Sequence, residues 1–255
     1  MRIDMHMHLT QPVSLVADKL RKLGFDHGIL CSSAVARGES VSTLADARAM
    51  MGRVADVQNK PTDQTVSQIN NDIMAAVNEH PDLLWGFGKI DLFQSGIPET
   101  IAEISTLGMK GIGEIVGIHG NTGLLTPVFE AAGAHALPVF LHTDYPVDAE
   151  DLSNILRLAG LFPETQIILG HAGGDFWIDA IEGAYAHPNI WLDTSEIVNQ
   201  VALQVAVNTI PDRVMFSSDF PWDSVESMLA RIDALNNSHQ VKEKVLGSNA
   251  ASLFR

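Results

Sequence analysis

The sequence predicts an α/β fold, a (β/α)8 TIM barrel that forms one domain over residues 1–255. Eight short apolar runs rich in β-branched and aromatic residues recur along the chain, and amphipathic stretches lie between most of them. This alternation is typical of parallel strands covered by helices, and eight strands close a barrel. Potential metal ligands also fall near the carboxyl ends of five runs, which an open doubly wound sheet would not explain.

The predicted strands are short and apolar on both sides, as expected between a barrel core and a ring of helices. In chain order they span residues 3–8, 27–33, 83–90, 110–115, 137–142, 166–171, 190–195 and 213–219.

The predicted helices repeat apolar residues with helical period, as in LVADKLRKLG at the first of them. Gly24, Gly108, Gly160 and the prolines Pro81 and Pro188 are typical helix stops. The helices span residues 15–24, 66–81, 99–108, 125–136, 149–160, 177–188 and 225–237.

Composition limits the possible partners. With 46% apolar residues and no break in composition, the chain can bury one large core. Sixteen Lys and Arg against 31 Asp and Glu give a net charge of −15, which disfavours nucleic acid and anionic membranes as partners. The single cysteine, Cys31, cannot form an internal disulfide, and no apolar run approaches the ~20 residues that cross a bilayer. We therefore expect a cytoplasmic protein.

Two histidines share one face of the first predicted strand. Because side chains alternate in a strand, His6 and His8 point the same way with Cα atoms ~6.6 Å apart, and Met5 and Met7 point toward the helices. Two imidazoles placed in this way can bind one cation.

The same alternation turns further candidate ligands inward. It pairs Glu114 with Ile112 on the fourth strand, His171 with Leu169 on the sixth, and Asp219 with Ser217 on the eighth. His142 ends the fifth strand. Imidazole and carboxylate ligands suit Zn²⁺, and also Mn²⁺, Fe²⁺ or Co²⁺. We expect one or two divalent ions per chain, with Zn first and Mn as the alternative.

Simpler interpretations compete at several positions. Glu114 could pair with Lys89 or Lys110, although Lys110 lies ~13 Å nearer the barrel floor. Asp219 could cap the helix at 225–237, a role that Asp223 or Ser224 fits better. Gly173 and Gly174 indicate either a plain turn or amides that meet a substrate anion. Asp193 and Ser195 are interpreted either as residues that contact the metal ligands from behind or as a polar rim, without a catalytic role.

Substrate-binding residues are expected in the loops that follow the strands. The long segment at about 34–64, between the second and third strands, is polar and partly helical, as lids and substrate walls are. Three arginines of this segment, Arg37, Arg48 and Arg53, could steer an anionic substrate. The candidates for substrate binding are Arg37, Arg53, Lys89, His119, Asp144 and Tyr145.

Together the motifs DMHMH, GMKGIGEI, VFLHTD, ILGHAGG, WLDTS, FSSDFPW and LGSNAASLF span nearly the whole chain. In these motifs the chain resembles the amidohydrolase superfamily, and within it the amidohydrolase 2 group of barrel-shaped metal-dependent enzymes. The resemblance implies a metal held by His6, His8 and Asp219, with His142 and His171 at the site. It also implies that Asp219 takes the proton from metal-bound water.

The superfamily divides at the fourth strand, and both branches stay open. If Glu114 bridges two cations, one is held by His6, His8, Glu114 and Asp219 and the other by Glu114, His142 and His171. Otherwise His6, His8, His142 and Asp219 hold one Zn²⁺, and His171 serves as acid, base or electrophile. The second branch includes decarboxylases resembling aminocarboxymuconate semialdehyde decarboxylase.

From these features we expect a metal-dependent hydrolase of a small ester, lactone or amide, with metal-bound hydroxide as nucleophile and Asp219 and His171 as catalytic residues. The alternatives are a non-oxidative decarboxylase of an unsaturated or aromatic acid and a non-catalytic metal-binding barrel. The expected partner is a small, anionic molecule, with no nucleic acid and no membrane, and the sequence leaves a homo-oligomer open.

Overall fold

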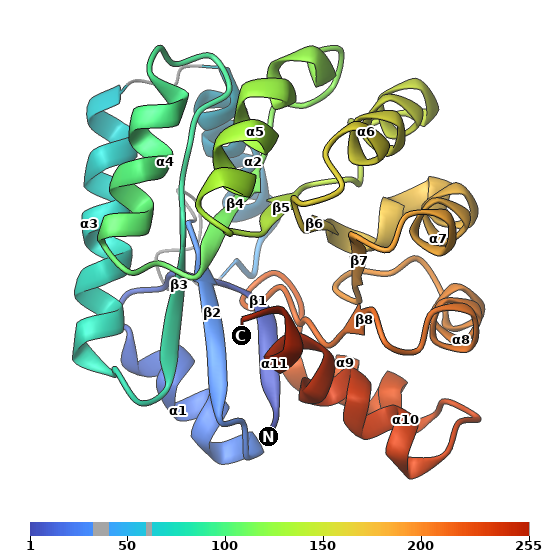
Figure 1. Cartoon of the computed structure of the whole chain (residues 1–255). Coiled ribbons are helices and arrows are strands. Elements are labelled where there is room, and N and C mark those ends of the chain that lie inside the picture. The colour runs from blue at the N-terminus through green and yellow to red at the C-terminus, as the bar shows by residue number, and fades with distance from the viewer. Residues whose placement is uncertain (33–40, 60–62, 255) are drawn as a thin grey trace.

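A computed structural model describes residues 1–32, 41–59 and 63–254, with 53–59 and 63–65 described by their backbone alone. The described residues form eight parallel strands in the order β1 to β8, surrounded by helices (Figure 1). Backbone hydrogen bonds from Met5 to Phe216 (3.0 Å) and from His8 to Phe220 (2.7 Å) join the first strand to the segment of the last. The predicted TIM barrel is therefore confirmed.

The strands of the barrel are short. They are β1 Ile3–His8, β2 His27–Cys31, β3 Leu84–Gly88, β4 Gly111–Ile115, β5 Val139–Leu141, β6 Ile167–Leu169, β7 Ile190–Asp193 and β8 Val214–Met215.

The helices mostly follow the strands one by one and form the outer ring. They are α1 Ser14–Leu23, α2 Leu44–Asn59, α3 Asp63–Glu79, α4 Ile97–Thr106, α5 Leu125–Ala134, α6 Ala149–Leu161, α7 Trp177–Ala186, α8 Gln200–Thr209, α9 Val225–Asp233, α10 His239–Glu243 and α11 Asn249–Leu253, with short 3-10 segments at Thr122–Leu124 and Gly170–Phe176 and a π-helical turn at Lys244–Ser248.

The predicted helices agree with these bounds to within a few residues. The segment at about 34–64, expected to be partly helical, contains helix α2; Gly160 lies inside α6 instead of ending it, and the short helices α10 and α11 were not predicted. Helix α8 was not predicted, because QVALQVAVNT has several β-branched valines and no charged face. Its start is set by Asn199, whose side chain accepts a hydrogen bond from the backbone N–H of Ala202 at 2.9 Å.

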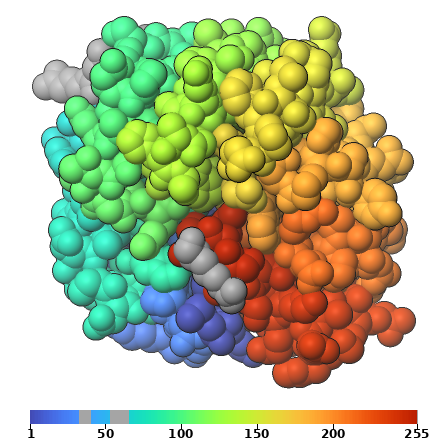
Figure 2. Space-filling model, in the orientation of Figure 1, coloured from blue at the N-terminus to red at the C-terminus, as the bar shows by residue number. Residues whose placement is uncertain are grey.

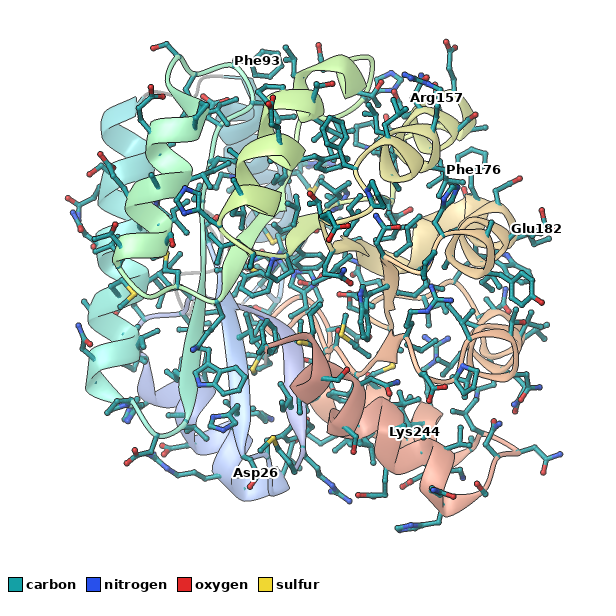
Figure 3. The ribbon with its side chains drawn as sticks, viewed as in Figure 1. Asp26, Phe93, Arg157, Phe176, Glu182 and Lys244 are labelled. Carbon is teal, nitrogen blue, oxygen red and sulfur yellow. The ribbon has the colours of Figure 1, made fainter. Side chains whose placement is uncertain are left out.

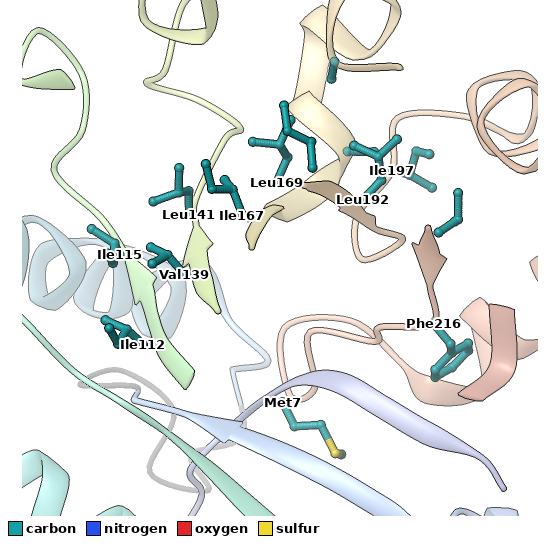
Figure 4. Close-up of a cluster of buried hydrophobic side chains, with 14 of the residues drawn as sticks. Met7, Ile112, Ile115, Val139, Leu141, Ile167, Leu169, Leu192, Ile197 and Phe216 are labelled. Carbon is teal, nitrogen blue, oxygen red and sulfur yellow. The ribbon is translucent and has the colours of Figure 1, made fainter. Parts of the chain in front are cut away.

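Apolar side chains form two layers, one on each side of the barrel wall. The outer layer packs the strands against the helices and includes Ile112, Val139, Leu169 and Leu192, all fully buried (Figure 4). The inner layer fills the barrel. It contains Ile3, Met5, Ile29, Cys31, Phe87, Phe140, Ile168, Trp191 and Met215.

The C-terminal segment closes one end of the barrel. Phe254 packs edge-on against Trp85 and Phe87, with ring centroids 5.4 and 6.0 Å away. In Figure 2 the C-terminal residues occupy the middle of this face, between the N-terminal and later segments of the chain. Lys110 lies at the same end, with its Nζ 5.8 Å from the centroid of the Trp85 ring. This position agrees with the prediction that Lys110 lies nearer the barrel floor than Glu114. The opposite end is left for a functional site.

A bulge in β1 corrects the predicted alternation. Asp4 pairs with Gly28 and Met7 with Leu30, so three steps along β1 face two along β2. Met5 consequently lies in the inner layer and only Met7 packs in the outer one, whereas both were expected to face the helices.

A second bulge turns Glu114 inward. Ile112 pairs with Val139 and Ile115 with Leu141, and both isoleucines lie in the outer layer. The predicted sharing of one face by Ile112 and Glu114 is therefore wrong. Gly113 has a φ of 132°, and a Cβ there would lie 2.4 Å from the Phe140 carbonyl oxygen, so only glycine fits.

Strands β6 and β8 end earlier than predicted, and turns replace their last residues. Leu169 lies in the outer layer, so it does not share a face with His171. His171 and Asp219 instead adopt left-handed conformations with φ of 55° and 57°. The backbone N–H of Asp219 donates to the His6 carbonyl at 2.8 Å, which ties this turn to β1.

Within the described ranges, no helix is long and apolar enough to cross a membrane.

Replacing Phe87 by alanine should lower the free energy of unfolding by about 3–5 kcal/mol, because it empties a fully enclosed position in the inner layer. Urea unfolding provides the measurement. Phe93→Ala is the matched control, since that ring is 55% exposed on the surface (Figure 3), and should change stability by no more than ~0.5 kcal/mol. Equal losses in the two variants would contradict the assignment of Phe87 to the inner layer.

Candidate metal centre

Histidines and acids converge at the carboxyl end of the barrel. They are His6 and His8 of β1, Glu114 of β4, His142 after β5, His171 after β6 and Asp219 after β8. His142 is partly exposed and the other five are buried. The structure thus brings together all six residues that the sequence proposed as metal ligands.

One group of atoms has the arrangement of a cation site. The Oδ1 atom of Asp219 lies 2.8 Å from Nε2 of His8 and 3.3 Å from Nε2 of His6, and Oε2 of Glu114 lies 3.6 Å from the same His6 nitrogen. Within the described part of the chain, His6 Nε2 and Asp219 Oδ1 are buried and make no hydrogen bond of good geometry, although Asp219 Oδ1 lies close to His8 Nε2. Buried polar atoms are almost always satisfied, so these two fit a cation between them.

A second group lies on the other side of Glu114. Its Oε1 atom is 2.8 Å from Nδ1 of His142 and 3.2 Å from Nε2 of His171, and these nitrogens are 3.1 Å apart. His6, His8 and Glu114 form one candidate ligand set, and Glu114, His142 and His171 form another. Glu114 therefore stands between the two histidine groups and belongs to both.

Asp193 and Ser195 link the two groups, which fits the first of the two interpretations that the sequence left open for them. Oδ2 of Asp193 lies 3.1 Å from Nδ1 of His6, and its Oδ1 accepts the backbone N–H of His171 at 3.0 Å. Ser195 Oγ donates to Asp193 Oδ1 at 2.6 Å and lies 3.1 Å from Nδ1 of His171. The signal was present in WLDTS, because an acid at a strand end can orient histidine ligands.

Buried carboxylates determine the charge of these imidazoles. Burial by itself lowers the pKa of His171, but the hydrogen bond to Glu114 and the charges of Glu114, Asp193 and Asp219 outweigh it and raise the pKa to about 9. In the same way, Asp219 and Glu114 raise the pKa of His6 well above its usual value despite burial. Protons and a cation therefore compete for the nitrogens of these rings.

Glu196 also reaches the site from the turn after β7. It adopts a left-handed conformation with φ of 47°, and a carboxylate oxygen lies within 4.8 Å of ligand atoms of His171 and Asp219. Nothing in the sequence pattern marked this residue, because it follows the strand on an exposed turn.

The residues proposed to bind substrate are distributed around the rim. Lys89 follows β3 and is half-buried. His119 is held away from the centre, since its Nδ1 lies 2.7 Å from Asp151 at the start of α6. The Tyr145 side chain is 87% exposed, while its backbone carbonyl accepts from Nε2 of His142 at 3.1 Å.

The glycine turn after His171 packs directly on Asp144. A Cβ at Gly174 would lie 2.3 Å from Oδ1 of Asp144, which explains the glycine by close approach. Arg37 and the Arg53 side chain lie outside the described residues.

Replacing Asp193 by asparagine should lower the affinity for Mn²⁺ about 10–100-fold, because it removes the carboxylate that orients His6 and anchors His171. Titration calorimetry against Mn²⁺ gives the affinity. Asp175→Asn changes an exposed acid of the neighbouring segment and should leave the affinity unaltered. Unchanged binding in the Asp193 variant would show that this residue does not position the ligands.

Comparison with solved structures gives full-length matches at low identity. The chain is similar to 5-carboxyvanillate decarboxylase from Sphingomonas paucimobilis, with 17% identity, a TM-score of 0.72 and coverage of 100% of this chain and 98% of that chain. An uncharacterized TIM-barrel protein from Bordetella bronchiseptica matches with 18% identity, a TM-score of 0.73 and coverage of 99% and 97%.

A third similar structure contains a metal. Dihydroxybenzoic acid decarboxylase from Polaromonas sp. JS666, with bound manganese and the inhibitor 2-nitroresorcinol, shares 18% identity at a TM-score of 0.69, with coverage of 99% and 96%. No curated protein matches the sequence.

These findings correct one expectation and identify the family. The activities named for these neighbours are decarboxylations of aromatic acids, which overturns the expected hydrolysis of an ester, lactone or amide in favour of the alternative. The profile described as Amidohydrolase matches residues 3–255. The chain belongs to the amidohydrolase family and is an enzyme with the TIM-barrel fold of that superfamily.

Proposed function

We propose that this enzyme is a metal-dependent decarboxylase that removes the carboxyl group of an aromatic or unsaturated carboxylic acid as CO₂, without oxidation. One observation carries the proposal: Glu114 separates a group of atoms fit for a cation from a pair of imidazoles. The activities named for the structural neighbours support the same reaction class.

The proposed ligands are His6, His8, Asp219 and Oε2 of Glu114. His8 and Glu114 approach the two buried atoms that lack a hydrogen bond, Nε2 of His6 and Oδ1 of Asp219. Oε1 of Glu114 already contacts His142 and His171, so we propose one ion per chain. A divalent ion bound there supplies a Lewis acid that binds and polarises substrate oxygens. We propose Mn²⁺ in place of the expected Zn²⁺, since the dihydroxybenzoic acid decarboxylase contains manganese and these ligands suit it.

His171 is the proposed proton donor. Its Nδ1 lies close to Ser195 Oγ and its Nε2 to Glu114, so an oxygen near each ring nitrogen can accept a hydrogen bond from the protonated imidazole. As the bond between the ring carbon and the carboxylate breaks, its electron pair stays on that carbon and takes the proton from Nε2. The products are CO₂ and the arene, and no water is consumed.

His142 offers a route by which His171 regains its proton. The two rings lie 3.1 Å apart between Nδ1 of His142 and Nε2 of His171, and the His142 side chain is 22% exposed. A proton from solvent can therefore reach the buried ring through a partly exposed one. Asp193 and Ser195 hold the buried ring in place during this exchange.

A decarboxylation assay tests the proposal. Mn²⁺-loaded protein is incubated with a panel of hydroxybenzoic, benzenedicarboxylic and unsaturated acids, and CO₂ release is followed. In D₂O, we expect one deuterium on the carbon that lost the carboxylate, because the proton comes from a group in exchange with solvent. Elemental analysis should give one ion per chain. A protein that binds Mn²⁺ but releases no CO₂ from any member of the panel would refute the proposal and favour a non-catalytic barrel.

The His171→Asn variant should release CO₂ about 10²–10⁴-fold more slowly, because the ring carbon loses its proton donor. Its Mn²⁺ content should stay near that of the wild type, since His171 is not among the proposed ligands. His239→Asn on α10 is the control, because that histidine is exposed and far along the chain from the site. Equal turnover in the two variants would rule out the role of His171.

A further inference from the structure

The direction of the Lys89 side chain follows from its neighbours on β3. Phe87 lies in the inner layer, whereas a Cβ on Gly88 would lie 2.5 Å from Ile104 of helix α4 and so faces outward. Lys89 is the first residue after β3, and we infer from the same alternation that its side chain turns toward the barrel interior, two residues beyond Phe87. Ile90, the next residue, again packs in the outer layer.

The backbone of Lys89 is fixed by a single side chain. Asn70 of α3 accepts the Lys89 N–H at 2.7 Å and donates to its carbonyl at 3.1 Å. Asn70 is only 6% exposed, so this pair of hydrogen bonds is shielded from water. The backbone from which the Lys89 side chain extends is therefore held firmly in place.

The ammonium group has no partner of its own in the described part of the chain, where no salt bridge or hydrogen bond involves Nζ of Lys89. Burial lowers the pKa of Lys89, and the nearby acids Glu114 and Asp91 oppose that change. Those acids are already engaged: Glu114 by the histidines, and Asp91 by the backbone N–H of Phe93 at 2.9 Å. As far as the described residues go, a half-buried cation near Glu114 is thus available to an anion.

We propose that Lys89 makes the enzyme selective for substrates that carry a second carboxylate, one that the reaction leaves in place. This inference rests on the proposed decarboxylation. An ammonium paired with the departing carboxylate would stabilise a charge that vanishes as CO₂ forms, and so would oppose cleavage. A retained carboxylate keeps its charge throughout and can be held without that cost. A phenol group is neutral at pH 7 and needs no such partner.

Binding of two simple probes tests the proposal without turnover. Benzene-1,3-dicarboxylate and benzoate are titrated into Mn²⁺-loaded protein by calorimetry. We expect the wild type to bind the dicarboxylate at least tenfold more tightly, and Lys89→Met to bind both probes with affinities within about twofold of each other. Lys89→Arg, which keeps the charge, should retain part of the preference. The wild-type preference should also weaken in high salt.

Lys110→Met is the matched control, because it removes a strand-associated lysine at the closed end of the barrel. It should leave the preference intact. A wild type without preference, or a preference that survives Lys89→Met, would overturn the proposal. Should Lys89→Met fail to fold, the wild-type preference, its salt dependence and Lys89→Arg still decide. Dicarboxylate selectivity through Lys89 without any CO₂ release would refute the proposed reaction and leave only the binding of a second carboxylate by Lys89.

Discussion

The candidate site depends on one buried carboxylate, that of Glu114. A carboxylate without partners in a protein interior is costly, and Glu114 is stable there because imidazoles approach both of its oxygens. Its charge in turn favours the protonated form of these rings. The bulge at Gly113 makes the arrangement possible, since without the extra residue Glu114 and Ile112 would compete for the same face. One irregularity in β4 therefore determines both the layer packing and the electrostatics of the rim.

Asp193 makes the two sides of the site interdependent. It contacts the ring of His6 through one oxygen and the backbone of His171 through the other, so a shift of either histidine is transmitted to its partner. Ser195 contacts both rings and fills the space between them. This network lies under the ligands and is almost fully enclosed. In a low-dielectric setting such hydrogen bonds are strong, which favours a rigid site over one that adapts to its ligand.

The sequence predicted the barrel, the order of its strands and the meeting of six residues at one rim, because all three follow from periodicity and from the topology of parallel strands. It did not predict the backbone conformations that place several of those residues at the rim. The inward turn of Glu114 comes from a bulge, and His171 and Asp219 are placed by left-handed turns after short strands. Such irregularities depend on packing between neighbouring strands, as between Gly113 and Phe140, which one strand's own pattern does not contain.

The ligand set alone led to the wrong reaction because hydrolysis and decarboxylation both need a cation held by histidines and acids. The difference lies in what stands beside that cation. Hydrolysis requires a group that accepts a proton from water, whereas decarboxylation requires a group that gives a proton to carbon. His171 has an oxygen close to each ring nitrogen, which fits the role of proton donor that we propose for this ring. Ser195 and Asp193, for which the sequence left a supporting role or a polar rim open, provide half of that environment. The chemistry of the barrel thus depends on residues under the ligands as much as on the ligands themselves.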